Sequence, residues 1–310
     1  MATERQPRGT AFALRDPLPW DAFAGIARAG ERAGYRAVFL PEIAGRDAFA
    51  ALTGLAGETT ELLLGTGIVP MTSRSPRLTA MGAVTVQERS RGRMILGLGT
   101  GPAGRGALEE LAGQVQELRA LLRGGSDLAL QAEPAVPIWI AALGPKAVAL
   151  AGRVADGILL NWCSPERVAE ARESMRGAAA AEGRDPDALT VAVYVRASVA
   201  VDPDASLAAL RDAFGEYASY GNYARQFAGM GMGDEAAAAA AAFLDGRPEA
   251  IPEALVRRIC LLGDPVAARD RLRDYRDAGA DLPVVYPALL RGDRDGSSIR
   301  STLLALAPSG

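Results

Sequence analysis

The sequence predicts a single (β/α)8 TIM-type barrel, and three observations favour this fold. Eight short apolar runs alternate with amphipathic helical stretches along the 310 residues, as in parallel β/α proteins. Most runs are apolar at nearly every position, which is typical of strands covered on both faces. A doubly wound sheet also alternates, but the count of eight favours the closed barrel. No linker rich in proline, glycine or serine divides the chain, so we expect residues 1–310 to form one domain.

The predicted strands are defined by their apolar runs and by the turn residues at their ends. In chain order they are Thr10 to Leu14, Ala37 to Leu40, Leu62 to Val69, Met94 to Leu98, Ile138 to Ala142, Gly157 to Trp162, Thr190 to Val199 and Pro283 to Tyr286. Short apolar runs of this kind, bounded by turn residues, are typical of buried strands.

Capping residues mark helices between these strands. Ser75-Pro76 and Ser164-Pro165 each combine a capping hydroxyl with a proline suited to the first helical turn. The helix after Ser75 is expected to reach about Ser90. A further predicted helix is opened by Asp16 and Pro17 and closed by Gly34. Another begins near Asp47, a third surrounds Leu108 to Leu122, and a fourth starts after Gly144-Pro145.

The segment between the seventh and eighth strands is far longer than one crossover helix, so we expect a helical insertion at about residues 203–258. The alanine-rich run Glu235 to Phe243 predicts a helix there, because alanine has the highest helix propensity. Tyr217, Tyr220 and Tyr223 recur every three residues, which would place them on one helical face. Packing onto the barrel is one interpretation. The other is a lid, with Tyr220 and Tyr223 as candidate proton or hydrogen-bond donors.

The composition narrows the chemistry. The chain has no histidine, which excludes a Ser-His-Asp triad, a histidine-ligated metal and an imidazole base. A formal net charge of −3 gives no reason to expect nucleic acid or an anionic membrane as partner. Cys163 and Cys260 lack metal-type spacing, so no metal site is predicted, and free thiols suit a reducing cytosol. Because no run approaches the ~20 residues of a bilayer span and no signal peptide is evident, we expect a cytoplasmic protein.

The end of the fifth predicted strand carries an anion-binding signal. The residues there are Ala141, Ala142, Leu143, Gly144, Pro145 and Lys146. Small residues and a lysine thus coincide with the start of a helix, whose free N–H groups can bind an anion. Active sites of β/α-barrels lie at this end of the strands. We therefore predict a phosphate site, with an ordinary strand-to-helix turn as the alternative.

Glycines mark two further strand ends. The fourth strand continues into Thr100 and Gly101, and the third contains Gly65 and Gly67. Glycine lets a backbone approach a ligand closely, although a tight turn or a bulge explains such positions equally well. The fourth-strand glycines form neither a Walker loop nor a dinucleotide fingerprint.

Glu42 follows the second predicted strand. A carboxylate at this end of a barrel strand is either catalytic or a structural partner, and Arg46 is close enough in sequence to pair with it. Because histidine is absent, Glu42 is the first candidate for a catalytic proton carrier, ahead of the insertion tyrosines.

A further signal comes from segments spread over most of the chain. In order they are Gly34 to Asp47, Leu64 to Ile68, Arg91 to Gly101, Pro137 to Lys146, Ala149 to Gly157, Leu262 to Pro265 and Pro283 to Pro287. Together they resemble the luciferase-like flavin and deazaflavin oxidoreductases, most closely the group that uses the deazaflavin coenzyme F420.

This resemblance implies a β/α-barrel with an insertion and a tricyclic cofactor ring over the end of the third strand. It also implies a non-prolyl cis peptide bond between Gly67 and Ile68 behind that ring. The cofactor-binding residues that it implies are Gly67, Ile68, Thr100, Gly101, Ala141, Ala142, Leu143, Gly144, Pro145 and Lys146. One departure is Ile43, which stands where some relatives have a catalytic histidine, so their chemistry does not carry over directly.

We therefore expect an F420-dependent oxidoreductase that transfers a hydride to or from a small organic substrate. Activated C=C or C=N bonds of secondary metabolism fit such chemistry. An FMN-dependent luciferase-like monooxygenase is the alternative enzyme, and a non-catalytic flavin-binding protein is the alternative from another class. The expected partner is a small molecule, neither nucleic acid nor a membrane is expected to bind, and a homodimer is compatible with the sequence.

Overall fold

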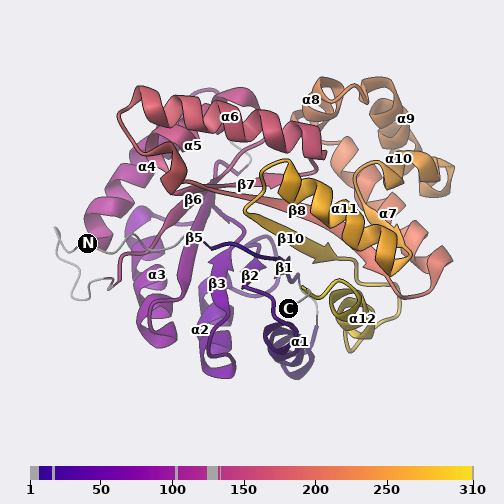
Figure 1. Cartoon of the computed structure of the whole chain (residues 1–310), viewed down its shortest axis with the longest axis horizontal. Coiled ribbons are helices and arrows are strands. Elements are labelled where there is room, and N and C mark those ends of the chain that lie inside the picture. The colour runs from indigo at the N-terminus through magenta and orange to yellow at the C-terminus, as the bar shows by residue number, and fades with distance from the viewer. Residues whose placement is uncertain (1–6, 16–17, 102–103, 124–131, 133, 309–310) are drawn as a thin grey trace.

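The computed structural model describes residues 7–15, 18–101, 104–123, 132 and 134–308, and it forms a closed (β/α)8 barrel (Figure 1). Eight parallel strands follow the order β10-β1-β2-β3-β5-β6-β7-β8, and pairing between β8 and β10 closes the ring. Two short strands lie outside this ring, with β4 paired to β5 and β9 paired to the end of β8. The predicted fold class is confirmed.

The strands reproduce the predicted apolar runs with small shifts at their ends. They are β1 (Ala11–Ala13), β2 (Ala37–Leu40), β3 (Leu63–Thr66), β4 (Val69–Pro70), β5 (Met94–Gly99), β6 (Ile138–Ala141), β7 (Gly157–Asn161), β8 (Thr190–Val199), β9 (Leu261–Gly263) and β10 (Leu282–Pro287). The run predicted as one third strand is divided into β3 and β4 by a bulge at Gly67 and Ile68. Strand β9 has no counterpart in the prediction.

Helices follow most of the strands and cover the outside of the barrel, whereas four consecutive helices lie between β8 and β9. They are α1 (Trp20–Arg32), α2 (Ala48–Glu58), α3 (Pro76–Ser90), α4 (Ala107–Leu122), α5 (Pro145–Val154), α6 (Pro165–Ala181), α7 (Pro203–Ala218), α8 (Gly221–Gly229), α9 (Gly233–Leu244), α10 (Glu253–Arg257), α11 (Pro265–Asp277) and α12 (Ser297–Ala305), with short 3-10 turns at Pro186–Ala188 and Pro248–Ala250.

The predicted helix caps hold with one exception. The hydroxyls of Ser75 and Ser164 accept hydrogen bonds from the first turns of α3 and α6, and Asp47 does the same for α2. Helix α1 begins at Trp20 rather than at the predicted Asp16-Pro17 pair, which lies outside the described residues. Proline at position 19 precedes the helix in an extended conformation, so the helix starts later than the earlier pair suggests.

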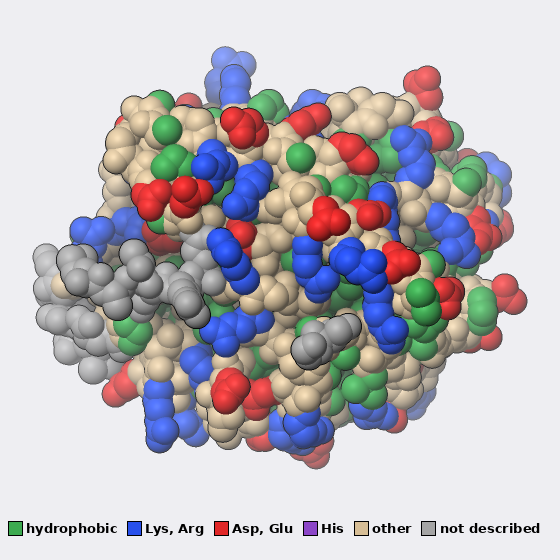
Figure 2. All heavy atoms as spheres, viewed as in Figure 1, with side chains coloured by type: hydrophobic (Ala, Val, Ile, Leu, Met, Phe, Trp, Pro, Cys, Tyr) green, Lys and Arg blue, Asp and Glu red, His purple; other side chains and the backbone are tan. Residues whose placement is uncertain are grey.

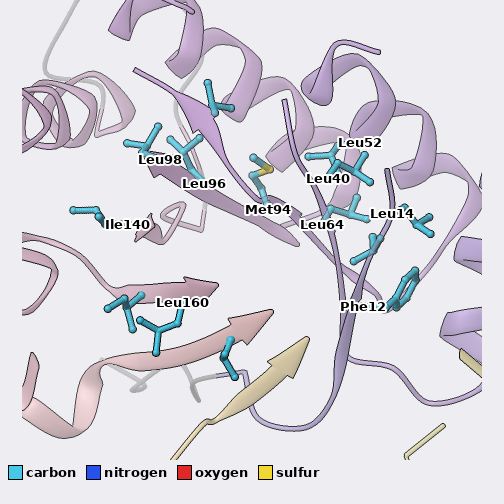
Figure 3. Close-up of a cluster of buried hydrophobic side chains, with 14 of the residues drawn as sticks. Phe12, Leu14, Leu40, Leu52, Leu64, Met94, Leu96, Leu98, Ile140 and Leu160 are labelled. Carbon is cyan, nitrogen blue, oxygen red and sulfur yellow. The ribbon is translucent and has the colours of Figure 1, made fainter. Parts of the chain in front are cut away.

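Side chains alternate between two cores along each strand. One set fills the barrel interior, where the rings of Phe39 and Trp139 lie 5.5 Å apart. The other set points outward and packs under the helices (Figure 3), and it joins Leu40 and Leu64 to Leu52 of α2. This double burial explains why the strands are apolar at nearly every position.

The insertion forms a third apolar cluster at one corner of the molecule, where α8, α9 and α10 lie together (Figure 1). Phe214 and Phe227 contact each other in it at 5.0 Å between ring centroids. Helix α7 ends at Ala218 and α8 begins at Gly221, so the predicted single helical face of Tyr217, Tyr220 and Tyr223 is wrong. A turn separates Tyr217 in α7 from Tyr223 in α8. Tyr220 lies in this turn and has the extended conformation of a residue that precedes a helix.

On the face shown in Figure 2, acidic and basic side chains are intermixed and form no extended region of one charge. Among the described helices, none has both the length and the apolarity that crossing a bilayer requires.

Candidate active site

A cavity of about 410 Å³ opens at the carboxyl ends of the barrel strands, where this fold places active sites. Tyr217, Asn222 and Tyr223 of the insertion line one side of it. The expected cofactor-binding residues that line it are Gly67, Ile68, Thr100, Gly101, Ala141, Ala142, Leu143 and Gly144. Pro145 and Lys146 do not line it and are exposed to solvent. Segments at the ends of three neighbouring strands, β3, β5 and β6, therefore meet around one space.

The bulge between β3 and β4 forms the floor of this cavity. The peptide bond between Gly67 and Ile68 is cis, as the family resemblance implies. The Tyr194 hydroxyl donates a hydrogen bond to the Gly67 carbonyl oxygen at 2.9 Å, and the Glu42 backbone N–H donates to the Ile68 carbonyl oxygen at 3.1 Å. Side chains are excluded here, because a Cβ at Gly67 would overlap the Tyr194 hydroxyl and one at Gly99 would lie 2.6 Å from Ile68 Cδ1. Both glycines are required by this close packing.

The first turn of α5, where the sequence predicts an anion site, forms another part of the cavity wall. Gly144 precedes the helix in an extended conformation, makes no side-chain cap, and lines the cavity together with Ala147. The first turn contains no acidic residue, and no atom of the described residues lies within 4 Å of the position that a Cβ on Gly144 would take. The positive end of the helix dipole therefore faces open space.

Glu42 lies at the rim of the cavity, and its carboxylate is held by other residues. Arg74 Nε donates to it at 2.8 Å, the Ser73 hydroxyl at 3.2 Å and the Ala48 backbone N–H at 3.3 Å. Arg74 also pairs with Asp47. The structural partner of Glu42 is thus Arg74, 32 residues away, and the predicted pairing with Arg46 is not seen. These contacts tie the loop after β2 to the loop after β4.

Arg46 points elsewhere, because one of its nitrogens donates to the Leu18 carbonyl oxygen at 2.6 Å and its guanidinium lies over the Phe23 ring. Closeness in sequence therefore did not identify the partner of Glu42.

The structure separates the two candidate tyrosines. Tyr223 lines the cavity, and its hydroxyl oxygen accepts a hydrogen bond from Asn161 Nδ2 at 2.8 Å. Burial raises the pKa of the Tyr223 hydroxyl above its usual value, so it stays protonated near neutral pH. Tyr220 is 45% exposed, does not line the cavity, and donates to Glu216 at 2.9 Å. Of the two, Tyr223 alone is placed to reach a molecule in the cavity.

Residues that the sequence reasoning missed line the inner wall. These residues come from β7, β8 and β10 and line the same cavity: Asn161, Tyr194, Arg196 and Tyr286. A signal for one of them is visible in the sequence, since Arg196 is the single charged residue in a ten-residue buried strand. A charge inside such a strand points to a buried role.

Comparisons with known proteins agree with this geometry. A family model described as luciferase-like monooxygenase matches residues 3–282. A 5,10-methylenetetrahydromethanopterin reductase of Methanolobus tindarius is 31% identical over 223 residues, which are 64% of this chain and 67% of that protein. A phthiodiolone/phenolphthiodiolone dimycocerosates ketoreductase of Mycobacterium bovis strain BCG is 27% identical over 319 residues, covering 90% of this chain and 83% of the relative.

A solved structure also superimposes on the chain. The coenzyme F420-dependent tetrahydromethanopterin reductase from Methanopyrus kandleri has a TM-score of 0.78, with 97% of this chain and 98% of the other chain covered. Sequence identity is 18%, so this likeness concerns the fold.

Proposed function

We propose that this chain, which belongs to the luciferase-like monooxygenase family, is an oxidoreductase that uses coenzyme F420 to move a hydride to or from a small organic substrate. The observation that carries the proposal is the meeting of the Gly67–Ile68 bulge, Thr100-Gly101 and the first turn of α5 around one cavity. The relatives named as a reductase and a ketoreductase support the reaction class, and the solved neighbour named as F420-dependent supports the cofactor.

The residues of the cavity fit a deazaflavin. The Asn161 side-chain oxygen is buried and has no hydrogen-bond partner among the described residues, although Asn161 lines the cavity. An unpaired buried acceptor is unfavourable unless a ligand supplies a donor, and the N–H edge of a flavin-type ring is one such donor. The open first turn of α5, free of acidic residues, fits the phosphate of the tail.

The residues of this chain have distinct tasks in the proposed reaction. When bound, F420 supplies two-electron hydride chemistry. Tyr223 would hold the proton that must accompany the hydride, because its oxygen accepts from Asn161 and its own hydrogen bonds to no other described residue. Glu42 is the alternative proton carrier. Its contacts with Arg74 and Ser73 favour a structural role instead, in which it holds the loops after β2 and β4 together.

Cofactor choice is tested by titrating the purified protein with F420 and, separately, with FMN. We expect the dissociation constant for F420 to be lower by about tenfold or more, a difference of about 1.4 kcal/mol in binding free energy. Ring absorbance or fluorescence reports both titrations. Equal or reversed affinities would favour the FMN-dependent monooxygenase, whose turnover needs oxygen, whereas F420-dependent turnover should proceed anaerobically. Tight binding of either cofactor without turnover of any substrate would favour the non-catalytic alternative.

The phosphate site is tested by Gly144→Asp. A carboxylate at the first turn of α5 repels a bound phosphate, so the binding free energy of F420 should weaken by about 1 kcal/mol or more. The fold should tolerate the change, because Gly144 is extended, its Cβ position is open, and aspartate is a favourable N-cap residue.

Gly144→Asn is the matched control, since it adds the same shape and capping ability without the charge. Its affinity should stay close to that of the wild type. If both variants bind F420 as the wild type does, the phosphate lies elsewhere in the cavity.

A further inference from the structure

Arg196 is a buried cation that forms no ion pair with any residue that the structure describes. It lies in the second half of β8 and is 7% exposed. Its Nη1 atom is buried without a hydrogen-bond partner, and no carboxylate among the described residues forms an ion pair with it. Guanidinium groups keep their charge in proteins, and an unpaired buried charge is unfavourable for folding. Such an arrangement needs a compensating group.

Aromatic rings give part of that compensation. The guanidinium carbon lies 3.8 Å from the ring centroid of Tyr286, 4.9 Å from that of Trp162 and 5.3 Å from that of Tyr217. Stacked rings hold the guanidinium plane in place and attract its charge weakly. They do not accept the directional N–H hydrogen bonds that a carboxylate accepts in pairs. The side chain is therefore held in one position with hydrogen-bonding capacity left over.

The position of Arg196 is the second observation. It lines the proposed cofactor cavity and also a neighbouring hollow of about 790 Å³ between α7 and the segment after β10. Tyr217 and Tyr286 line both spaces as well, so these three residues form the boundary between them. Much of the hollow is apolar, with Leu210 and Leu289 among its lining residues. A molecule in the hollow would thus meet the guanidinium next to the site of hydride transfer.

We propose that Arg196 binds the carboxylate of the substrate, and that the substrate is an organic acid with an apolar or aromatic body. A carboxylate is favoured over a phosphate, because one buried guanidinium matches a single planar anion. The apolar walls of the hollow would hold the remainder of the acid. This proposal names the substrate class of the proposed oxidoreductase, and therefore rests on that function, but its test requires no turnover.

Three matched pairs of probes test the proposal: benzoate with benzamide, cinnamate with cinnamamide, and hexanoate with hexanamide. Binding to the full-length protein is measured by calorimetry in the presence and in the absence of F420. At least one carboxylate should bind about tenfold or more tightly than its amide, which has nearly the same shape and no charge. If none of the carboxylates is preferred over its amide, the proposal is overturned, even when F420 binds normally. Carboxylate preference without F420 binding would support the acid site and contradict the cofactor.

Substitution of Arg196 tests whether this residue causes the preference for a carboxylate over its amide. In Arg196→Met, which keeps the length of the side chain, the carboxylate should lose its advantage over the amide. Arg291→Met is the matched control, because Arg291 lines the same hollow with a side chain that is 97% exposed, and it should keep most of the preference. A preference that survives in Arg196→Met overturns the proposal.

The stability of the unliganded variant gives an independent readout. Removing an unpaired buried charge should leave the thermal midpoint of Arg196→Met equal to or above that of the wild type. If Arg196→Met fails to fold, Arg196→Gln takes its place, because it keeps a polar side chain without the charge, and a carboxylate preference that survives in Arg196→Gln overturns the proposal. If Arg196→Lys folds with a weakened preference, the bidentate role of the guanidinium is supported.

Discussion

Replacing Tyr223 by phenylalanine is expected to slow single-turnover hydride transfer by about two to four powers of ten, the range typical of losing a positioned general acid. The substitution removes only the hydroxyl and keeps the ring that contacts Tyr217 at 4.8 Å between centroids. Affinity for F420 should fall far less than the rate, because Tyr223 lies on the insertion and its loss affects the cofactor only through the hydrogen bond that orients Asn161. Stopped-flow absorbance and cofactor titration measure the two quantities separately.

Two comparison variants show whether slow hydride transfer in Tyr223→Phe reflects the loss of the proton carrier. Tyr220→Phe makes the same chemical change in a neighbouring tyrosine outside the cavity, and its rate should stay near that of the wild type. Glu42→Gln should lower the thermal midpoint, because it weakens the contact with Arg74, and should leave the rate within a few fold. A rate loss of about a hundredfold or more in Glu42→Gln, with Tyr223→Phe normal, would transfer the proton role to Glu42.

Gly67→Ala is expected to lower the free energy of unfolding by about 1–3 kcal/mol through overpacking. The added Cβ would overlap the Tyr194 hydroxyl, which is buried and already donates a hydrogen bond to the Gly67 carbonyl oxygen. Displacing this hydroxyl also breaks a buried hydrogen bond, which costs about another 1–3 kcal/mol. Because Gly67 forms the cavity floor, F420 affinity should fall in the same variant. Urea unfolding and cofactor titration measure both effects.

A double-mutant cycle shows whether this overlap is the cause. Tyr194→Phe removes the hydroxyl that the new Cβ would strike, so the double variant should be more stable than the sum of the two single effects predicts, by about 1 kcal/mol or more. Gly113→Ala is the matched control, since Gly113 lies within α4 and no described atom lies within 4 Å of its Cβ position. That change should stabilise the protein by about 0.5–1 kcal/mol. Additive effects in the cycle would mean that Gly67 matters for another reason.

The sequence was informative wherever structure depends on residues close along the chain. Strand β8 and helix α3 have the predicted bounds, because an apolar run and a Ser-Pro cap act within a few residues. The cis bond at Gly67–Ile68 was implied by the motif resemblance. The sequence also placed Gly144 at the start of a helix at a strand end. In a closed barrel all strand ends of one kind meet at one rim, so fold class and strand bounds together located the cavity.

The tertiary structure alone decided which side chains face that cavity and which partners they have. Glu42 pairs with Arg74 and not with Arg46, because loops after different strands meet at the rim regardless of their separation in sequence. Tyr223 faces the cavity while Tyr220 faces solvent, because a turn between α7 and α8 breaks the helical period on which spacing arguments depend. Arg196 lacks an ion-pair partner among the described residues because of what surrounds it in space. Contacts between distant segments depend on packing, and local residue preferences carry no information about them.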